Sequence, residues 1–177
     1  RASHHPAARH CRMTGAPIRA MLRRNKHSEA GMALHFSMEE FERRKAALMA
    51  AMATRGLDGL LLFQQETMYW LTGYDSFGFC FFQCLVMRAD GRMVLLTRSA
   101  DLRQAEHTSN LTDIRIWRDG KGVDPARELL AIAQDLGLAG KRLGVEYESY
   151  GLVAANGKKL DAAFEGRAAL VDASDIV

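Results

Sequence analysis

The sequence predicts an α/β domain built on a mixed, partly parallel β-sheet with helices on both faces. Three observations carry this prediction. First, 177 residues with 48% hydrophobic composition suffice for one domain with a substantial buried core. Second, helical and strand patterns alternate along the chain after an initial helix. Third, the short apolar run Gly59–Phe63 is typical of a strand buried on both faces of a parallel or mixed sheet.

The first expected element is a helix over about 38–54. Ser37 is its N-cap and Glu40 completes a capping box, because these two residue types satisfy free backbone N–H groups at a helix start. Apolar side chains recur at helical spacing, and Gly56 ends the helix. The first strand, Gly59–Phe63, follows after a turn.

A short helix over 64–73 comes next, with Thr67 as a candidate N-cap and Gly73 as its end. Phe79–Met87 is rich in aromatic and β-branched residues and pairs with Met93–Thr97, because an Asp-Gly step between them favours a hairpin turn. The remaining expected elements are a helix over 99–107, a strand over 111–117, a helix over 125–136 that begins after Asp124, a strand over 142–146, a helix over 150–164 and a strand over 168–172.

Residues 1–31 are strongly basic. They hold seven Arg/Lys and one acid, a net charge of +6, which leaves 17 Lys/Arg against 20 Asp/Glu, or −3, in the rest of the chain. Their low apolar content predicts a disordered basic tail, or a leader that is not native sequence, ahead of a domain over 32–177. Nucleic-acid binding through this tail is one hypothesis. For the domain we expect no nucleic acid and no membrane as partner.

The three cysteines, Cys11, Cys80 and Cys84, are odd in number and form no C-x-x-C pair. This pattern favours a reducing compartment, and we expect a cytoplasmic protein without disulfides. Cys80 and Cys84 fall on the same face of the predicted strand 79–87, where both are expected in the core. A structural zinc site needs four ligands, and only His35 and His107 remain outside the tail, so we expect no zinc.

No pattern of catalytic residues stands out. There is no phosphate-binding glycine loop and no G-x-S-x-G motif. His107 is expected at the end of a helix, where its favourable interaction with the helix dipole explains the presence of a histidine. Asp58, Glu146 and Asp172 fall near strand ends and either cluster there or, as is commoner, act as solvated turn acids. The sequence therefore predicts neither a catalytic nor a metal-ligating residue.

Residues 56–97 carry a resemblance. Gly-Leu-Asp-Gly-Leu-Leu at 56–61, Met-Tyr-Trp-Leu-Thr-Gly-Tyr at 68–74 and the hydrophobic hairpin that follows resemble the N-terminal domain of the creatinase/prolidase family, which includes Xaa-Pro aminopeptidases and ectoine-hydrolase-like proteins. The element order extends the resemblance over nearly all of 33–177. It implies the ribonuclease-H-like layering of the family's N-terminal domain. Thr67 and Trp70 depart from the Asn and Tyr that the family often has there.

The resemblance also implies that the chemistry lies in a C-terminal pita-bread domain, in which two Asp, one His and two Glu hold a pair of divalent metals (Mn, Zn or Co). That domain is absent from this chain, so we expect the fragment alone to be inactive and to hold no cofactor. The parent is expected to be an Xaa-Pro dipeptidase, aminopeptidase or related amide hydrolase acting on a small peptide or amide. Creatine is disfavoured, because creatinases place an arginine after this motif and residues 74–87 contain no Arg or Lys.

Finally, the resemblance implies a homodimer in which the loop after the L-T-G motif reaches the active site of the partner subunit. The residues assigned to it are Tyr74, Asp75, Phe77, Phe79 and Phe81. Two alternatives stay open. In the first, Phe79 and Phe81 face the core of their own strand. In the second, the domain is a free-standing small-molecule binding module that uses the 74–79 loop.

Overall fold

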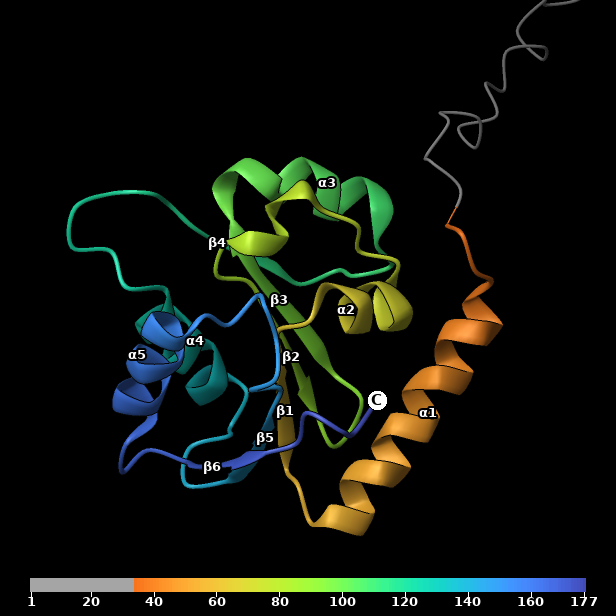
Figure 1. Ribbon diagram of the computed structural model, residues 1–177. Helices are drawn as coiled ribbons and strands as arrows, with labels where there is room; N and C mark the ends of the chain where they lie inside the picture. Colours follow the sequence, from red (N-terminus) through yellow and green to blue (C-terminus); the bar gives the residue numbers. More distant parts are fainter. Residues whose placement is uncertain (1–33) are drawn as a thin grey trace, which may run out of the picture. The chain divides into compact units, whose positions relative to one another are not determined.

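Six strands form a single mixed sheet in the order β4-β3-β2-β1-β5-β6, and this computed structural model describes residues 34–177 (Figure 1). The strands are β1 (Gly59–Leu62), β2 (Cys84–Arg88), β3 (Met93–Arg98), β4 (Ile114–Trp117), β5 (Arg142–Val145) and β6 (Ala169–Asp172). The pairs β1–β2 and β2–β3 are antiparallel, while β3–β4, β1–β5 and β5–β6 are parallel. The predicted mixed, partly parallel sheet is confirmed. The predicted tail over 1–31 lies outside the described residues.

Helices cover both faces of the sheet, as predicted (Figure 1). They are α1 (Met38–Arg55), α2 (Gln65–Thr72), α3 (Leu102–Thr108), α4 (Pro125–Asp135) and α5 (Ala154–Phe164), with 3-10 turns η1 (Phe77–Cys80) and η2 (Ser99–Asp101). The side chains of α1, α2 and α3 pack on one face and those of α4 and α5 on the other. The side chains of β1 alternate between the two faces of the sheet. Leu60 and Leu62 belong to the core under α1, α2 and α3, and Leu61 belongs to the core under α4 and α5.

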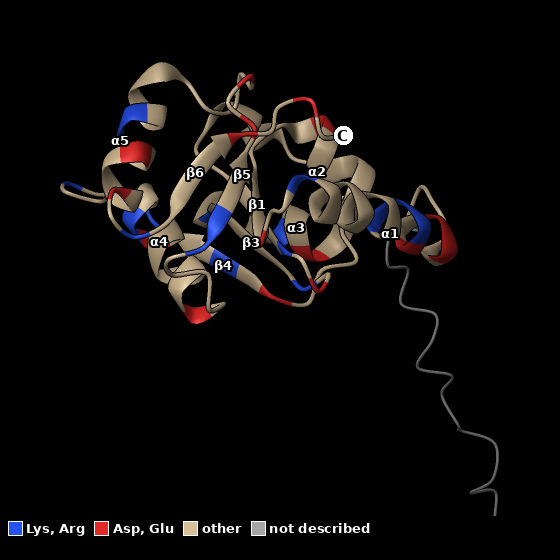
Figure 2. Ribbon diagram, turned by 90° about the horizontal axis from the view of Figure 1, so that it is seen from below, with Lys and Arg blue, Asp and Glu red and all other residues tan. Residues whose placement is uncertain are grey.

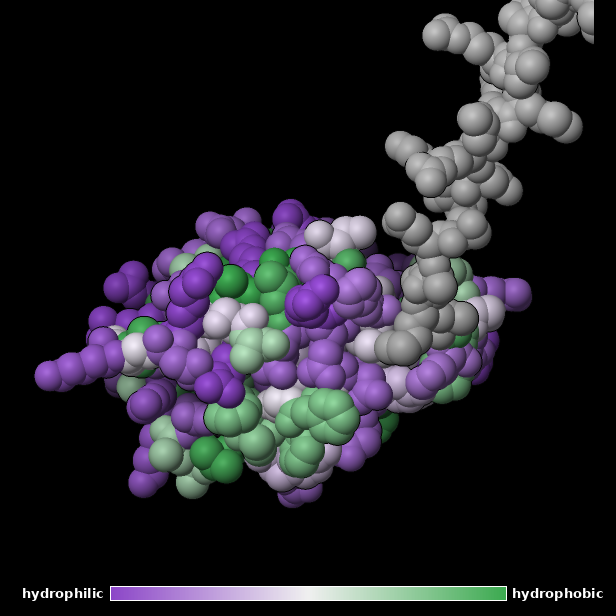
Figure 3. All heavy atoms as spheres, turned by 90° about the horizontal axis from the view of Figure 1, so that it is seen from above, coloured by the Kyte–Doolittle hydropathy of each residue, from purple (hydrophilic) through white to green (hydrophobic). Residues whose placement is uncertain are grey.

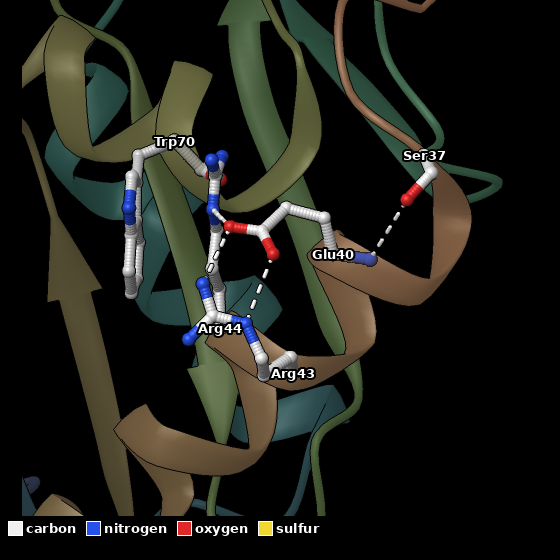
Figure 4. Close-up of polar contacts among 5 residues, drawn as sticks. All are labelled: Ser37, Glu40, Arg43, Arg44 and Trp70. Atoms are coloured by element: carbon white, nitrogen blue, oxygen red, sulfur yellow. Dashed lines mark hydrogen bonds and ion pairs between the residues drawn. The ribbon is translucent and has the colours of Figure 1, made fainter.

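Helix α1 begins as predicted at Ser37, whose Oγ accepts a hydrogen bond from the Glu40 backbone N–H at 3.2 Å. The carboxylate of Glu40 instead accepts from Arg43 and Arg44, and the Arg43 bond lowers its pKa to about 2 (Figure 4). Arg44 is buried and donates through Nη1 to the carbonyl of Trp70 at 2.8 Å. This arginine therefore ties α1 to α2.

Three predictions about local structure were wrong. Strand β2 starts at Cys84 and not at Phe79, because Ser76 Oγ accepts from the Gly78 N–H and turns residues 77–80 into η1. As a result Cys80 is exposed, whereas Cys84 is buried as expected. Thr67 is not an N-cap but lies inside α2, whose N-cap is Gln64.

Charged groups of both signs are spread over the helices and loops rather than gathered by sign (Figure 2). Over the described residues, none of the helices combines the length and the apolar character needed to cross a membrane.

The tight packing of β5 yields a prediction. A Cβ added at Gly144 would lie 2.7 Å from Leu60 Cδ2 and 2.8 Å from Ala173 Cβ, so Gly144→Ala is expected to destabilise the fold by about 1–3 kcal/mol. Gly157 is the matched control, because a Cβ there meets nothing within 4 Å and alanine favours its helix by about 0.5–1 kcal/mol. Urea denaturation measures both, and equal effects at the two positions would contradict the packing described.

Candidate functional site

The candidate site lies at the edge of the sheet where the parallel strands β1 and β5 end. Helix α2 and the 73–83 loop follow β1, and the 147–153 loop follows β5. The Phe79 and Tyr150 rings meet edge to face, with centroids 5.8 Å apart, so the two segments are in contact. In open α/β sheets the carboxyl ends of the strands are where ligands usually bind.

A buried carboxylate holds these segments together. Glu146 follows β5 directly and is 2% exposed. Its Oε2 accepts from the backbone N–H groups of Phe63 at 2.8 Å and Gln64 at 2.9 Å, and its Oε1 accepts from Thr67 Oγ1 at 2.6 Å. Burial raises the pKa of the Glu146 carboxyl, against the lowering effect of these three bonds. The interpretation of Glu146 as a solvated turn acid was wrong.

Asp58 and Asp172 do not join Glu146. The Asp58 carboxylate accepts from the Arg142 backbone N–H at 3.0 Å, and Asp172 accepts from Ser174. The three strand-end acids therefore form no cluster. Glu146 acts alone, as an acceptor for the first residues of the α2 segment.

Tyr74 was assigned to the exposed loop, and this assignment is corrected. Its side chain is 0% exposed, and its hydroxyl donates to Gln83 Oε1 at 2.5 Å and lies 2.9 Å from Thr97 Oγ1. Burial raises the pKa of this tyrosine. Tyr74 therefore fixes the start of the loop to β3 and presents no side chain at the surface.

The other assigned residues lie at the surface. Asp75 is exposed, and the exposed fractions are 87% for Phe77, 45% for Phe79 and 41% for Phe81. The alternative that Phe79 and Phe81 face the core is wrong, because both precede β2. We call the segment 74–83, which carries Phe77, Phe79 and Phe81, the aromatic loop. The face seen in Figure 3 carries hydrophobic side chains gathered within a largely hydrophilic surface. Whether the aromatic loop faces a partner subunit stays a prediction.

Sequence reasoning missed two residues beside the aromatic loop. Tyr150 donates to both carboxylate oxygens of Glu66, at 2.7 and 2.6 Å, and this bond raises the pKa of Tyr150 to about 12. Arg98 lies over the Phe81 ring at 4.1 Å and donates to Asp119. Residues 74–87 contain no Arg or Lys, but Arg98 places a cation beside the aromatic loop. This cation is paired with Asp119. No local signal marks either residue, because both contacts are long-range.

Between residues 34 and 177, no group of three or more His, Cys, Asp or Glu side chains is placed to hold a metal ion. These residues therefore do not fit a metal pair, and the resemblance places that pair in a C-terminal domain. A depression of about 620 Å³ is lined by Tyr147, Asp161 and Phe164 among others, and none of its lining residues comes from 74–81. The exposed groups suit a docking contact better than an enclosed site.

Comparisons with known proteins identify relatives of this domain. Residues 44–177 match the family model described as the creatinase/prolidase N-terminal domain. The ectoine hydrolase of Halomonas elongata is 35% identical over 77 residues, which are 44% of this chain and 19% of that protein. The chain spans about a fifth of the length of the curated relatives it matches.

Two solved structures have the same fold. The N-terminal domain of the cytoplasmic peptidase PepQ from Mycobacterium tuberculosis has a TM-score of 0.58 and 26% identity, covering 76% of this chain and 95% of that one. Prolidase from Thermococcus sibiricus has a TM-score of 0.65 and 17% identity, covering 80% of this chain and 36% of that one. The fold is therefore that of an N-terminal domain in larger proteins.

Glu146 yields two predictions. Glu146→Ala leaves two backbone N–H groups and the Thr67 hydroxyl without their acceptor, so we expect a loss of about 3 kcal/mol in the free energy of unfolding. Glu146→Gln keeps one acceptor oxygen for the N–H groups and offers an amide to Thr67, so we expect a loss under about 1 kcal/mol. Equal losses in the two variants, measured in urea, would contradict this expectation, because glutamine keeps the shape and one acceptor oxygen that alanine removes.

The second concerns pH. Because the pKa of Glu146 is raised in the folded state, the folded protein binds this proton more tightly than the unfolded chain, whose value is near 4.5. The stabilisation is complete below that pH and is lost as pH rises through the folded pKa. The stability of the wild type relative to Glu146→Gln should therefore fall as the pH rises from about 4.5 towards neutral. Urea midpoints across this range test it, and a difference that grows with pH would contradict it.

Proposed function

The chain belongs to the creatinase/prolidase N-terminal domain family, and from this premise we propose that it is the non-catalytic N-terminal domain of a longer metal-dependent hydrolase. The parent is an Xaa-Pro dipeptidase, an Xaa-Pro aminopeptidase or a related amide hydrolase that acts on a small peptide or amide. The domain supports a homodimer and covers the active site of the partner subunit with its aromatic loop.

The observation that carries this proposal is the exposure of the aromatic loop on a firmly anchored base. Phe77 is 87% exposed in this domain. An aromatic side chain contributes most to the free energy of binding when an interface buries it. The loop starts at the buried Tyr74 and ends at the buried Gln83, which share a hydrogen bond. Rigid aromatic side chains held in solvent on such a base are typical of a contact surface. In this proposal, the partner that covers this surface is a second copy of the protein.

The chemistry belongs to polypeptide beyond this domain. Two facts support this placement: the chain spans about a fifth of the length of its curated relatives, and the described residues bring together no metal-binding group. A pair of divalent metals in a C-terminal domain would activate a water molecule for amide hydrolysis. No residue of 34–177 is assigned a step in that reaction.

The location proposed is the cytoplasm. The Mycobacterium tuberculosis neighbour is described as a cytoplasmic peptidase. The free thiols of Cys80 and Cys84 are compatible with a reducing compartment.

The full-length protein provides the test. Phe77→Ala and Phe79→Ala together should lower kcat/KM for an Xaa-Pro dipeptide by about tenfold or more, because a lid that excludes water and positions substrate is lost. The metal content and the melting temperature should stay at wild-type values. Val123→Ala removes an exposed apolar side chain elsewhere and is the matched control.

Unchanged kcat/KM in the double variant would overturn the covering role. A full-length protein that stays monomeric at assay concentration would overturn the role in dimerisation.

A further inference from the structure

The carboxylate of Asp101 lies directly beneath the turn that carries Phe77 and Phe79. Asp101 is the last residue of η2 and is 7% exposed. Its Oδ1 accepts from Ser76 Oγ at 3.2 Å, while its buried Oδ2 has no hydrogen-bond partner among the described residues. A buried acceptor without a donor costs free energy, so its retention calls for a physical explanation.

Gly78 packs directly against this carboxylate. A Cβ at this position would lie 2.3 Å from Asp101 Oδ2 and 2.6 Å from its Cγ and Oδ1. Gly78 does not have a positive φ, so its backbone conformation is open to other residues. Close approach to the carboxylate, and not conformation, is therefore the reason for glycine here.

Ser76 links the carboxylate to the turn. Its Oγ donates to Asp101 and accepts from the Gly78 N–H at 2.8 Å, and the Gly78 carbonyl accepts from the Phe81 N–H at 2.9 Å. A continuous series of contacts thus runs from η2 to both ends of η1. These contacts hold the turn from which Phe77 projects into solvent.

We propose that Asp101 is a positioning residue that holds the aromatic loop in a preformed turn before any partner docks. The purpose that we assign to the turn rests on the proposed function, whereas the existence of the turn does not. A preformed turn docks without the entropy loss of ordering a loop, which favours tight contact with the partner subunit. The proposal also assigns Ser76 and Gly78 a role as the contacts through which Asp101 acts.

Hydrogen exchange of the Phe81 amide, followed by NMR in the 177-residue chain, tests the proposal. In the wild type this amide should exchange at least about tenfold more slowly than in an unstructured chain. Gly78→Ala should raise its rate about tenfold, because the new Cβ overlaps the carboxylate. Gly157→Ala, which adds a Cβ in open space, should leave it unchanged.

The double variants separate positioning from general stability. Asp101→Ala alone should raise the Phe81 rate about tenfold, because the Ser76 hydroxyl loses its acceptor and the turn loses its support. In that background, adding Gly78→Ala should change the rate by no more than about twofold, because the clash is gone. In an Asp101→Asn background the amide still fills the space, so the full effect of Gly78→Ala should persist. Asp101→Asn alone should keep most of the protection, since its oxygen still accepts from Ser76. If Asp101→Ala does not fold, Asp101→Ser replaces it.

Wild-type protection of the Phe81 amide in Asp101→Ala, or in Asp101→Ser, would overturn the proposal, and so would the same effect of Gly78→Ala in that background and in the wild type. So would an unprotected Phe81 amide in the wild type. Each of these failures leaves the proposed function standing, and an unprotected amide would mean that the loop becomes ordered on docking. Conversely, protected exchange combined with full activity of the Phe77→Ala/Phe79→Ala enzyme would leave the positioning role of Asp101 intact and remove the covering function.

Discussion

One buried carboxylate sets the geometry on which the candidate site depends. Glu146 joins the end of β5 to the end of β1 and to the first residues of the α2 segment, through two backbone N–H groups and the Thr67 hydroxyl. Helix α2 has no side-chain cap of its own, since Gln64 makes no capping bond. The start of α2 is therefore held by a residue more than 80 positions away in sequence. The aromatic loop follows α2, so this contact fixes the segment from which the loop begins.

The domain thus combines a buried, hydrogen-bonded scaffold with an exposed aromatic loop. In the scaffold, polar groups such as Glu146, Tyr74 and Thr97 are buried and hydrogen-bonded to one another or to the backbone. At the surface, Phe77 and Phe79 stand in solvent although burial would favour them. This combination suits a domain that shapes the surroundings of a reaction carried out elsewhere, which is the role proposed within the creatinase/prolidase family.

Elements that rest on local signals were predicted well from the sequence. The cap at Ser37, the apolar run of β1, the Asp-Gly hairpin and the Asp124-Pro125 start of α4 each carry their cause within a few residues. The failures share a different cause. The turn η1 lies against Asp101, and the buried side chains of Tyr74 and Glu146 have hydrogen-bond partners distant in sequence. The resemblance located the loop, but only the fold shows which of its side chains face solvent.

The crystal structure of the full-length dimer tests the central claim most directly. The decisive quantity is the exposed fraction of Phe77, which is 87% in this domain alone. The account predicts that Phe77 is buried against the partner subunit, beside the metal-bearing active site. A dimer in which Phe77 stays in solvent, away from both active sites, would contradict it.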